Sequence, residues 1–185
     1  PILIGPQERI REAARKAGVD LASYTIVDVP HSHAAADKAV ELVLNGKAEA
    51  IMKGSLHTDE LMAAVVRREN GLRTARRVSH CFVMDVPAYE DPLIISDAAV
   101  NIMPTLEDKV DIVQNAIDLA HALAFAEVRV AILSAMETVN PKVPSTVEAA
   151  ALCKMADRKQ ITGAVLDGPL ALDNAISLAA AEIKK

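Results

Sequence analysis

Five short polar signatures contain the residue types of this chain that are suited to binding anions and to moving protons. Each one follows a predicted strand or precedes a predicted helix. They are Lys53-Gly54-Ser55-Leu56-His57-Thr58, Ser79-His80, Ser96-Asp97, Ser134-Ala135-Met136-Glu137 and the segment 167–174, which begins Asp167-Gly168-Pro169. Because open α/β sheets bind ligands at the ends of their strands, we predict that the five signatures line one polar crevice.

The first signature has the composition of a phosphate site at a strand-to-helix turn. Gly54 allows the backbone to approach a ligand, and Lys53 supplies a positive charge. Free N–H groups at the start of the following helix, near Ser55 and Thr58, favour an anion. The Gly-x4-Gly-Lys spacing of a Walker A loop is missing. The alternative is a solvated lysine beside a capped helix.

A cluster of arginines follows this helix, around the turn Asn70-Gly71. Its members are Arg67, Arg68, Arg73, Arg76 and Arg77. Arginine binds phosphate through two parallel hydrogen bonds. Arg73 and Arg77 are the better candidates for a ligand, because they lead into the Ser79-His80 strand. The others are typical of a solvated helix end.

Carboxylates follow several of the predicted strands. Asp97 and Asp167 at strand ends are suited to act as a base or to hold a ribose hydroxyl, and equally suited to form turns. Glu137 lies past a strand end, which makes it a better functional candidate than the glutamates of the helices. Asp173 is most simply explained as a helix N-cap.

The serine and histidine pair at 79–80 does not predict a hydrolase. Adjacent residues of a strand point to opposite faces of the sheet, so Ser79 and His80 do not form a catalytic pair. No Gly-x-Ser-x-Gly elbow is present either.

The composition favours helices packed on a parallel sheet and disfavours several classes of partner. Of the 185 residues 51% are hydrophobic but only 2% are aromatic, so the core must be aliphatic. Single-stranded nucleic acid needs stacking aromatics, and a net charge of −5 disfavours polyanions in general. The two cysteines have no metal-ligand or disulfide spacing, which indicates a reducing cytoplasm. No signal peptide or membrane-spanning run is found, so no membrane association is predicted.

The alternation of elements predicts an α/β fold with two lobes. Strands are expected at 2–5, 24–29, 50–52, 78–86, 93–95, 128–133 and 161–166. Helices are expected within 6–17, 36–44, 58–68 and 105–124, and from 145 and 173 onward, with Thr58 as an N-cap and capping boxes at Thr105/Asp108 and Ser145/Glu148. This order predicts a mainly parallel sheet with crossover helices. No helix fits between 78–86 and 93–95, so that pair is predicted to be antiparallel.

We place the lobes at residues 1–75 and 76–185, with a cleft between them.

Taken in order, the signatures resemble those of the phosphate acetyltransferase and phosphate butyryltransferase family. The resemblance covers nearly the whole chain, through Met52-Lys53-Gly54…Thr58, Gly71-Leu72-Arg73, Val78-Ser79-His80, 92–101 with Pro104, 130–135 with Glu137, and 167–175. The Lys-Gly and Asp-Gly-Pro-Leu-Ala-Leu-Asp forms are closer to the butyryl branch. They also resemble the acyltransferase part of bifunctional enoyl-CoA hydratase/phosphate acetyltransferases.

The resemblance implies a two-lobed α/β/α fold like that of isocitrate and isopropylmalate dehydrogenases, with the site in the cleft. It implies the reaction acyl-CoA + phosphate ⇌ acyl phosphate + CoA, with coenzyme A as a substrate and without a bound cofactor or metal. It also implies a homodimer or higher oligomer and a fused hydratase-like domain. The candidate residues for binding phosphate or CoA are Lys53, Gly54, Ser55, Thr58, Arg73, Arg77, Ser79 and Asp167; the catalytic candidates are Ser96, Asp97, Ser134 and Glu137.

One departure from the family pattern bears on activity. Family members continue into a Gly-Asn segment and a Ser-Arg segment, and the sequence stops at Lys185 without them. We therefore expect that the chain lacks the C-terminal part of the family and is poorly soluble or inactive alone. Three alternatives stay open: an NAD-dependent dehydrogenase of the same fold, an acyl-phosphate synthase using acyl carrier protein, and a non-catalytic interaction or regulatory fragment. The dehydrogenase needs an Asp cluster with Lys and Tyr, and neither Tyr24 nor Tyr89 has such neighbours.

Overall fold

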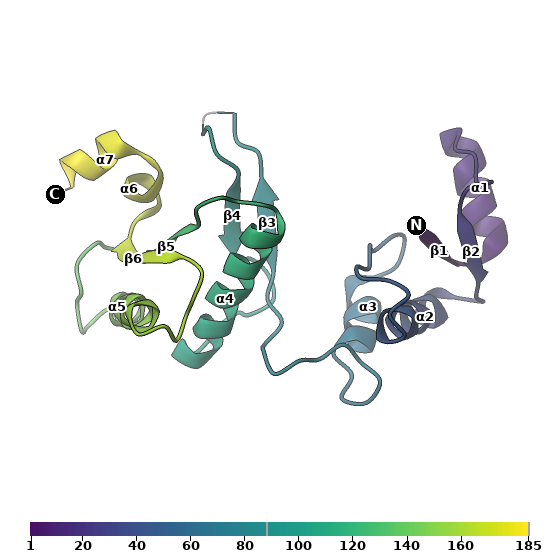
Figure 1. The fold of residues 1–185 in the computed structure, drawn as a ribbon, viewed down its shortest axis with the longest axis horizontal. Coiled ribbons are helices and arrows are strands. Elements are labelled where there is room, and N and C mark those ends of the chain that lie inside the picture. Colours follow the sequence, from purple (N-terminus) through teal and green to yellow (C-terminus); the bar gives the residue numbers. More distant parts are fainter. Residues whose placement is uncertain (88, 185) are drawn as a thin grey trace. The chain divides into compact units, whose positions relative to one another are not determined.

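The computed structural model describes residues 1–87 and 89–184. Ala88, inside the predicted loop between two strands, and Lys185, at the end of the predicted second lobe, lie outside the described residues. The contacts within the chain form two compact units, Pro1–Ala75 and Arg76–Lys185. Figure 1 shows the elements of each unit, coloured along the sequence.

The first unit is a two-stranded parallel sheet with three helices. Its elements are β1 (Ile2–Gly5), α1 (Gln7–Ala17), β2 (Thr25–Asp28), α2 (Ser32–Leu44) and α3 (Thr58–Val65). Strands β1 and β2 pair with Ile2 opposite Thr25, and α1 is the crossover between them (Figure 1). Ala36 and Val40 of α2 are buried against Ala64 of α3, which forms the core of this unit.

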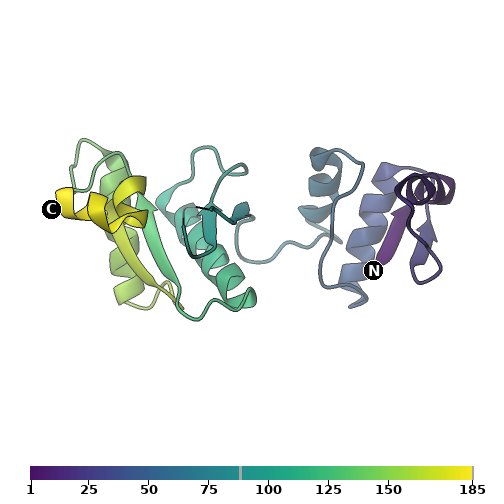
Figure 2. The same ribbon diagram turned by 90° about the horizontal axis from the view of Figure 1, so that it is seen from above.

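Within its described residues, the second unit has two pairs of strands and four helices. Its elements are β3 (Cys81–Met84), β4 (Leu93–Ser96), α4 (Leu106–Ala122), β5 (Arg129–Leu133), α5 (Pro144–Asp157), β6 (Val165–Leu170), α6 (Leu172–Ile176) and α7 (Leu178–Ile183). Strands β3 and β4 are antiparallel, whereas β5 and β6 are parallel and joined through α5. Figure 2 shows α5 lying along this parallel pair, with α6 and α7 following β6.

The core of the second unit is aliphatic, as the composition predicts. Ile117 of α4, Leu152 of α5 and the residue Ile161 are almost completely buried together. Ile94 of β4 and the inward residues of β5 and β6 pack around them. The α/β class with mainly parallel pairing is confirmed, and so is the antiparallel pair that the missing helix predicted. Among the described residues, no helix has both the length and the apolar character needed to cross a membrane.

The predicted strand at 50–52 does not form. Residues 50–53 have no strand assignment, and the only strand ladder in the described part of the first unit is β1 with β2. An apolar run becomes a strand only where a neighbouring strand can pair with it. Ile51 instead packs on the α2–α3 core, and Met52 is 96% exposed.

Three predicted helix starts are also wrong, although the helices exist. Helix α3 already includes Thr58, and its N-cap is His57. Helix α5 starts at Pro144 without a side-chain cap, because the hydroxyl of Ser145 bonds Ser134 and the carboxylate of Glu148 pairs with Lys109. Asp173 lies in the first turn of α6 rather than at its cap. The box at Thr105 and Asp108 is confirmed.

Several predicted element ends are shifted. The strand predicted at 78–86 occupies only 81–84, and the helix predicted at 58–68 ends at Val65. The last strand occupies 165–170 rather than 161–166, since Gly163 has a left-handed φ of 88° and turns the chain just before it. Asp167 therefore lies inside β6, opposite Ala131, and not at a strand end. Helix α4 ends at Ala122, so Ala124, predicted on its inner stripe, is exposed.

Candidate functional site

The candidate residues are divided between the two units. The first unit holds Lys53, Gly54, Ser55, Thr58 and Arg73, and the second unit holds Arg77, Ser79, Ser96, Asp97, Ser134, Glu137 and Asp167. The five polar signatures therefore do not follow strand ends of a single sheet, because the described strands form three separate pairs.

The Lys53 turn in the first unit is shaped by its own lysine. The Lys53 ammonium group donates to the carbonyl oxygen of Leu56 at 2.8 Å and more weakly to that of Gly54 at 3.4 Å. Nothing lies within 4 Å of the position that a side chain at Gly54 would occupy. Lys53, Gly54, Ser55 and Thr58 are all exposed. The turn thus exposes the positive charge of Lys53 and the hydroxyl groups of Ser55 and Thr58 to solvent.

The start of α3, next to this turn, already contains an acidic group. Glu60 accepts a hydrogen bond from the His57 N–H at 3.1 Å and another from the Ser32 hydroxyl at 3.0 Å. The hydrogen bond from Ser32 is the largest influence on the pKa of Glu60 and lowers it. Burial acts in the opposite direction, the His57 hydrogen bond lowers the pKa further, and the net result is a lowered pKa. An anion at the Lys53 turn would therefore depend on Lys53 more than on the helix terminus.

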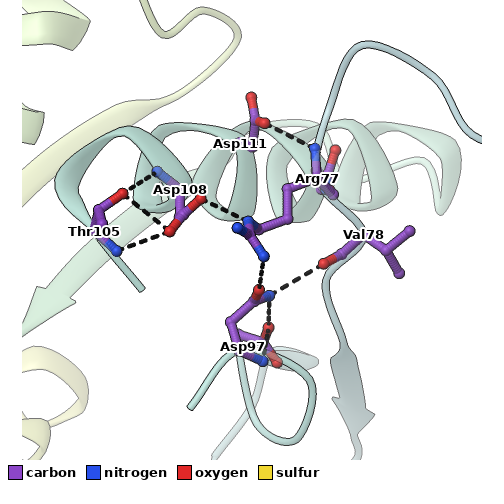
Figure 3. A network of polar contacts seen from close by, with 8 residues as sticks. Arg77, Val78, Asp97, Thr105, Asp108 and Asp111 are labelled. Atoms are coloured by element: carbon purple, nitrogen blue, oxygen red, sulfur yellow. Dashed lines mark hydrogen bonds and ion pairs between the residues drawn. The ribbon is translucent and has the colours of Figure 1, made fainter. Parts of the chain in front are cut away.

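Arg77 is the centre of a polar network in the second unit (Figure 3). Its Nε donates to Oδ1 of Asp108 at 2.6 Å, and its Nη1 donates to Oδ1 of Asn101 at 3.3 Å. Its backbone N–H donates to Asp111 Oδ2 at 2.8 Å, and its carbonyl oxygen accepts from Asn115 at 2.9 Å. The structure therefore fixes both the backbone and the guanidinium of Arg77 against α4.

Asp97 anchors the loop that follows β4. Its carboxylate accepts from the backbone N–H groups of Ala99, Val100 and Asn101 at 3.0–3.1 Å, and from the Asn101 amide group. Burial by itself would raise the pKa of Asp97, but these hydrogen bonds outweigh it and lower the pKa to about 2. A carboxylate with so low a pKa is a poor proton acceptor near neutral pH.

A hollow of about 260 Å³ opens beside this network. It is lined by Arg77, Val100, Asn101, Ile102, Met103, Pro104 and Asp108. The hydrogen bonds of Thr105 are the main cause that lowers the pKa of Asp108. Burial raises this pKa to a smaller extent, and the contact with Arg77 lowers it further. The hollow therefore contains one guanidinium and one ionised carboxylate beside apolar walls.

Two serines near the antiparallel pair differ in their contacts. Ser79 Oγ accepts from the Asn115 amide at 3.0 Å, which links it to the Arg77 network. Ser96 Oγ is buried and has no hydrogen-bond partner among the described residues, and the same holds for Nδ1 of His80. The ring of His80 packs edge-on against Phe82, with centroids 4.6 Å apart. Ser96 is thus a buried hydroxyl whose hydrogen-bonding capacity is unused.

Ser134 and Glu137 follow β5 and contact later elements. The Ser134 hydroxyl lies 2.7 Å from that of Ser145, in the first turn of α5. Glu137 accepts from the Lys184 ammonium group at 2.8 Å, and Lys184 also donates to Asp173 at 2.8 Å. The Lys184 bond is the main cause that lowers the pKa of Glu137. Lys184, directly after α7, thus forms ion pairs with both Glu137 and Asp173.

Asp167 and Gly168 fill structural roles in β6. The Asp167 carboxylate accepts from the N–H of Gly168 at 2.8 Å. A Cβ atom at Gly168 would lie 2.8 Å from both the Cβ and the carbonyl oxygen of Ile132 in β5. The Asp-Gly-Pro motif is therefore explained in part by close packing of two strands.

Four residues that the sequence did not predict as site residues complete these contacts: Asn101, Asp108, Ser145 and Lys184; Asp108 and Ser145 were predicted only as members of capping boxes. Asn101 does lie in the segment that carries the family resemblance, which was the only local signal. Asp97, one of its partners, lies four positions away, but Val78 and Arg77 lie 23 and 24 positions away, so no spacing rule predicts those two contacts. No group of three or more His, Cys, Asp or Glu side chains within 1–87 and 89–184 is placed to hold a metal ion.

Comparison with known proteins gives a consistent assignment. A family model described as Phosphate acetyl/butaryl transferase matches residues 31–185. Over 184 residues the chain is 64% identical to a phosphate acetyltransferase of Rhizobium meliloti, covering 100% of the chain and 58% of that protein. Over 183 residues it is 45% identical to a phosphate butyryltransferase of Clostridium acetobutylicum, covering 99% of the chain and 61% of that protein. The chain thus spans little more than half the length of these relatives.

Solved structures agree with the fold. A branched-chain phosphotransacylase from Enterococcus faecalis V583 has a TM-score of 0.78 at 28% sequence identity, covering 99% of this chain and 72% of that one. The EutD phosphotransacetylase from Staphylococcus aureus has a TM-score of 0.76 at 18% sequence identity, covering 100% of this chain and 64% of that one. At that identity the second likeness concerns the fold alone.

Proposed function

Because the chain belongs to the phosphate acetyl/butyryl transferase family, we propose that its protein catalyses acyl-CoA + phosphate ⇌ acyl phosphate + CoA. The observation that carries this proposal is the family match over residues 31–185. Acetyl and butyryl groups are both candidate acyl groups, since relatives named for each are similar over nearly the whole chain.

The chemistry sets three requirements for the protein. In one direction the CoA thiolate attacks the carbonyl carbon of the acyl phosphate, the bond from that carbon to the phosphate oxygen breaks, and phosphate leaves. Positive groups must hold the phosphate, donors must stabilise the negative charge that develops on the carbonyl oxygen, and both substrates must be aligned.

We assign the phosphate and CoA contacts to the two groups of basic and hydroxyl residues. Lys53 with Gly54, Ser55, Thr58 and Arg73 forms one group. Arg77 with Ser79 forms the other, supported by the hollow beside Arg77, and Asp167 stays a prediction for the same role.

Among the catalytic candidates, Ser96 and Ser134 are suited to donate a hydrogen bond to the carbonyl oxygen. The unused hydroxyl of Ser96 supports this role. Glu137 stays a candidate whose carboxylate is held by Lys184. For Asp97, the saturated carboxylate favours a structural role over that of a base.

The finer predictions concern the whole protein. We propose two lobes related to those of isocitrate and isopropylmalate dehydrogenases, and a homodimer or higher oligomer. A cytoplasmic location suits the two free cysteines, Cys81 and Cys153. Coenzyme A would be a substrate without any bound cofactor, and a fused enoyl-CoA hydratase-like domain stays a prediction.

Release of the CoA thiol tests the reaction. A longer polypeptide that contains this chain and spans the length of its relatives is incubated with acetyl-CoA or butyryl-CoA and phosphate. We expect thiol release that depends on phosphate, and the ratio of the two rates gives the acyl preference. Absence of phosphate-dependent release with both donors would contradict the proposal.

Replacing Lys53 by alanine in this longer enzyme should raise the KM for phosphate or lower kcat/KM about tenfold or more. One charge-assisted contact contributes on the order of 1.4 kcal/mol. Lys47→Ala is the matched control, because Lys47 is also an exposed lysine of the first unit. Equal phosphate kinetics in the two variants would remove Lys53 from the site.

A further inference from the structure

Asn101 connects three parts of the second unit through one amide group. Its Nδ2 donates to the carboxylate of Asp97 and to the carbonyl oxygen of Val78, the latter at 3.1 Å. Its Oδ1 accepts from Nη1 of Arg77 at 3.3 Å. Two acceptors on one side fix the NH2 group there, so the amide oxygen has to face the guanidinium.

The anchor of this amide is itself held firmly. Asp97 accepts from three consecutive backbone N–H groups of the loop that carries Asn101, so the loop closes around the carboxylate. The amide of Asn101 therefore has little freedom to turn. Its oxygen is a fixed acceptor in front of Arg77.

Arg77 needs such a second contact to be held in one orientation. Asp108 binds only its Nε, so the planar guanidinium as a whole could pivot about this single contact. The Asn101 oxygen binds Nη1 and supplies the second point of attachment. A guanidinium has five N–H donors, so donors remain for an anion in the hollow that Arg77 lines.

We propose that Asn101 is a positioning residue, which orients the Arg77 guanidinium so that it binds a phosphoryl group in this hollow. The inference rests on the proposed function for its substrates: the phosphoryl group is that of phosphate or one of those of CoA. Asn101 lines the same hollow, and its proposed effect on the ligand is exerted through Arg77.

Binding measurements on the full-length protein test this role. The dissociation constants of inorganic phosphate and of CoA are measured separately by calorimetry. Asn101→Ala should weaken one of the two about tenfold, equivalent to about 1.4 kcal/mol, and the affected ligand identifies the source of the phosphoryl group. Gln114→Ala is the control, because the Gln114 amide makes three hydrogen bonds, two with Thr162 and one to Asp118, and none of them involves Arg77. Its affinities should stay unchanged.

A double-mutant cycle separates positioning from a general loss of structure. Lysine cannot contact Asp108 and Asn101 through a planar fork, so Arg77→Lys should remove the benefit of Asn101. Adding Asn101→Ala to Arg77→Lys should then weaken binding by less than about twofold, because two residues of one network are not additive. A full tenfold further loss would overturn the inference, and so would unchanged affinities for both ligands in Asn101→Ala.

Two outcomes distinguish this inference from the proposed function. Loss of affinity in Asn101→Ala in a protein without acyl transfer would support the inference and sink the proposed reaction. Normal acyl transfer with wild-type affinities in Asn101→Ala would sink the inference alone. Should Asn101→Ala fail to fold, Asn101→Ser replaces it, since a hydroxyl keeps a short donor toward Asp97 but not the amide oxygen that meets Arg77.

Discussion

Replacing Gly71 by alanine is expected to lower the free energy of unfolding of the first unit by about 3 kcal/mol, the upper part of the range for overpacking. The new Cβ would clash with the carbonyl oxygen of Arg67 and would lie 2.8 Å from that of Val65. Both are backbone atoms, in the last residue of α3 and two residues beyond it. The Val65 oxygen also accepts the N–H of Leu72 at 2.8 Å, so relief of the clash would break this contact.

Urea denaturation followed by circular dichroism measures this effect. Gly54→Ala is the matched control, because open space surrounds the Cβ position at Gly54 in the same unit. Similar midpoints for the two variants would show that the end of α3 adapts easily. A selective loss would show that Gly71, which belongs to a family motif, has a structural function.

The elements that the sequence predicted correctly depend on local signals. Helix α1 stops at Gly18, and the Thr105 box starts α4, because cap residues act on their own neighbours. The antiparallel pair follows from the absence of any helical pattern between two apolar runs. The family resemblance, read from ordered motifs, is confirmed by the match over residues 31–185.

The elements that were predicted wrongly depend on distant partners. The run at 50–52 has the residues of a strand but finds no neighbouring strand in the described part of its unit. Ser145 and Glu148 have the spacing of a capping box, yet their side chains bond Ser134 and Lys109, which lie elsewhere in the chain. A local pattern cannot show which distant group competes for a side chain.

The candidate site divides in the same way. Residue types and strand order predicted Arg77 and Asp97 as functional, and the structure joins them through Asn101. The hydrogen-bond partners of each side chain, and therefore its role, could not be predicted, because the donors come from other elements. Asp97 is the clearest case: its sequence context allowed a base, a ribose ligand or a turn residue, and its contacts favour the turn.

Asp97→Asn is expected to lower the free energy of unfolding by about 2–3 kcal/mol at pH 7, since hydrogen bonds to a charged group are involved. An amide has one acceptor oxygen, and its NH2 group would face either the N–H groups of Ala99 and Val100 or the two donors of Asn101. Asp20→Asn is the control, because the Asp20 carboxylate accepts only one backbone N–H, that of Ala22, among the bonds found in the structure. It should change stability far less.

The pH dependence of this difference identifies its cause. In the folded protein the pKa of Asp97 is lowered from 3.8 to about 2, so the wild type has its full advantage above about pH 4 and loses it as the pH falls toward 2. One pKa unit corresponds to about 1.4 kcal/mol, and partial exposure reduces the effect, so about 1–2 kcal/mol should disappear. Urea denaturation of both proteins at pH 7, 5 and 3 measures this, and roughly half of the loss should be seen at pH 3, which lies between the two pKa values. A difference that is equal at all three values would rule out the ionised carboxylate as the source of stability. A wild-type kcat profile with a group titrating near neutral pH, absent in Asp97→Asn, would instead make Asp97 the base, because the chemistry would then require a raised pKa and not a lowered one.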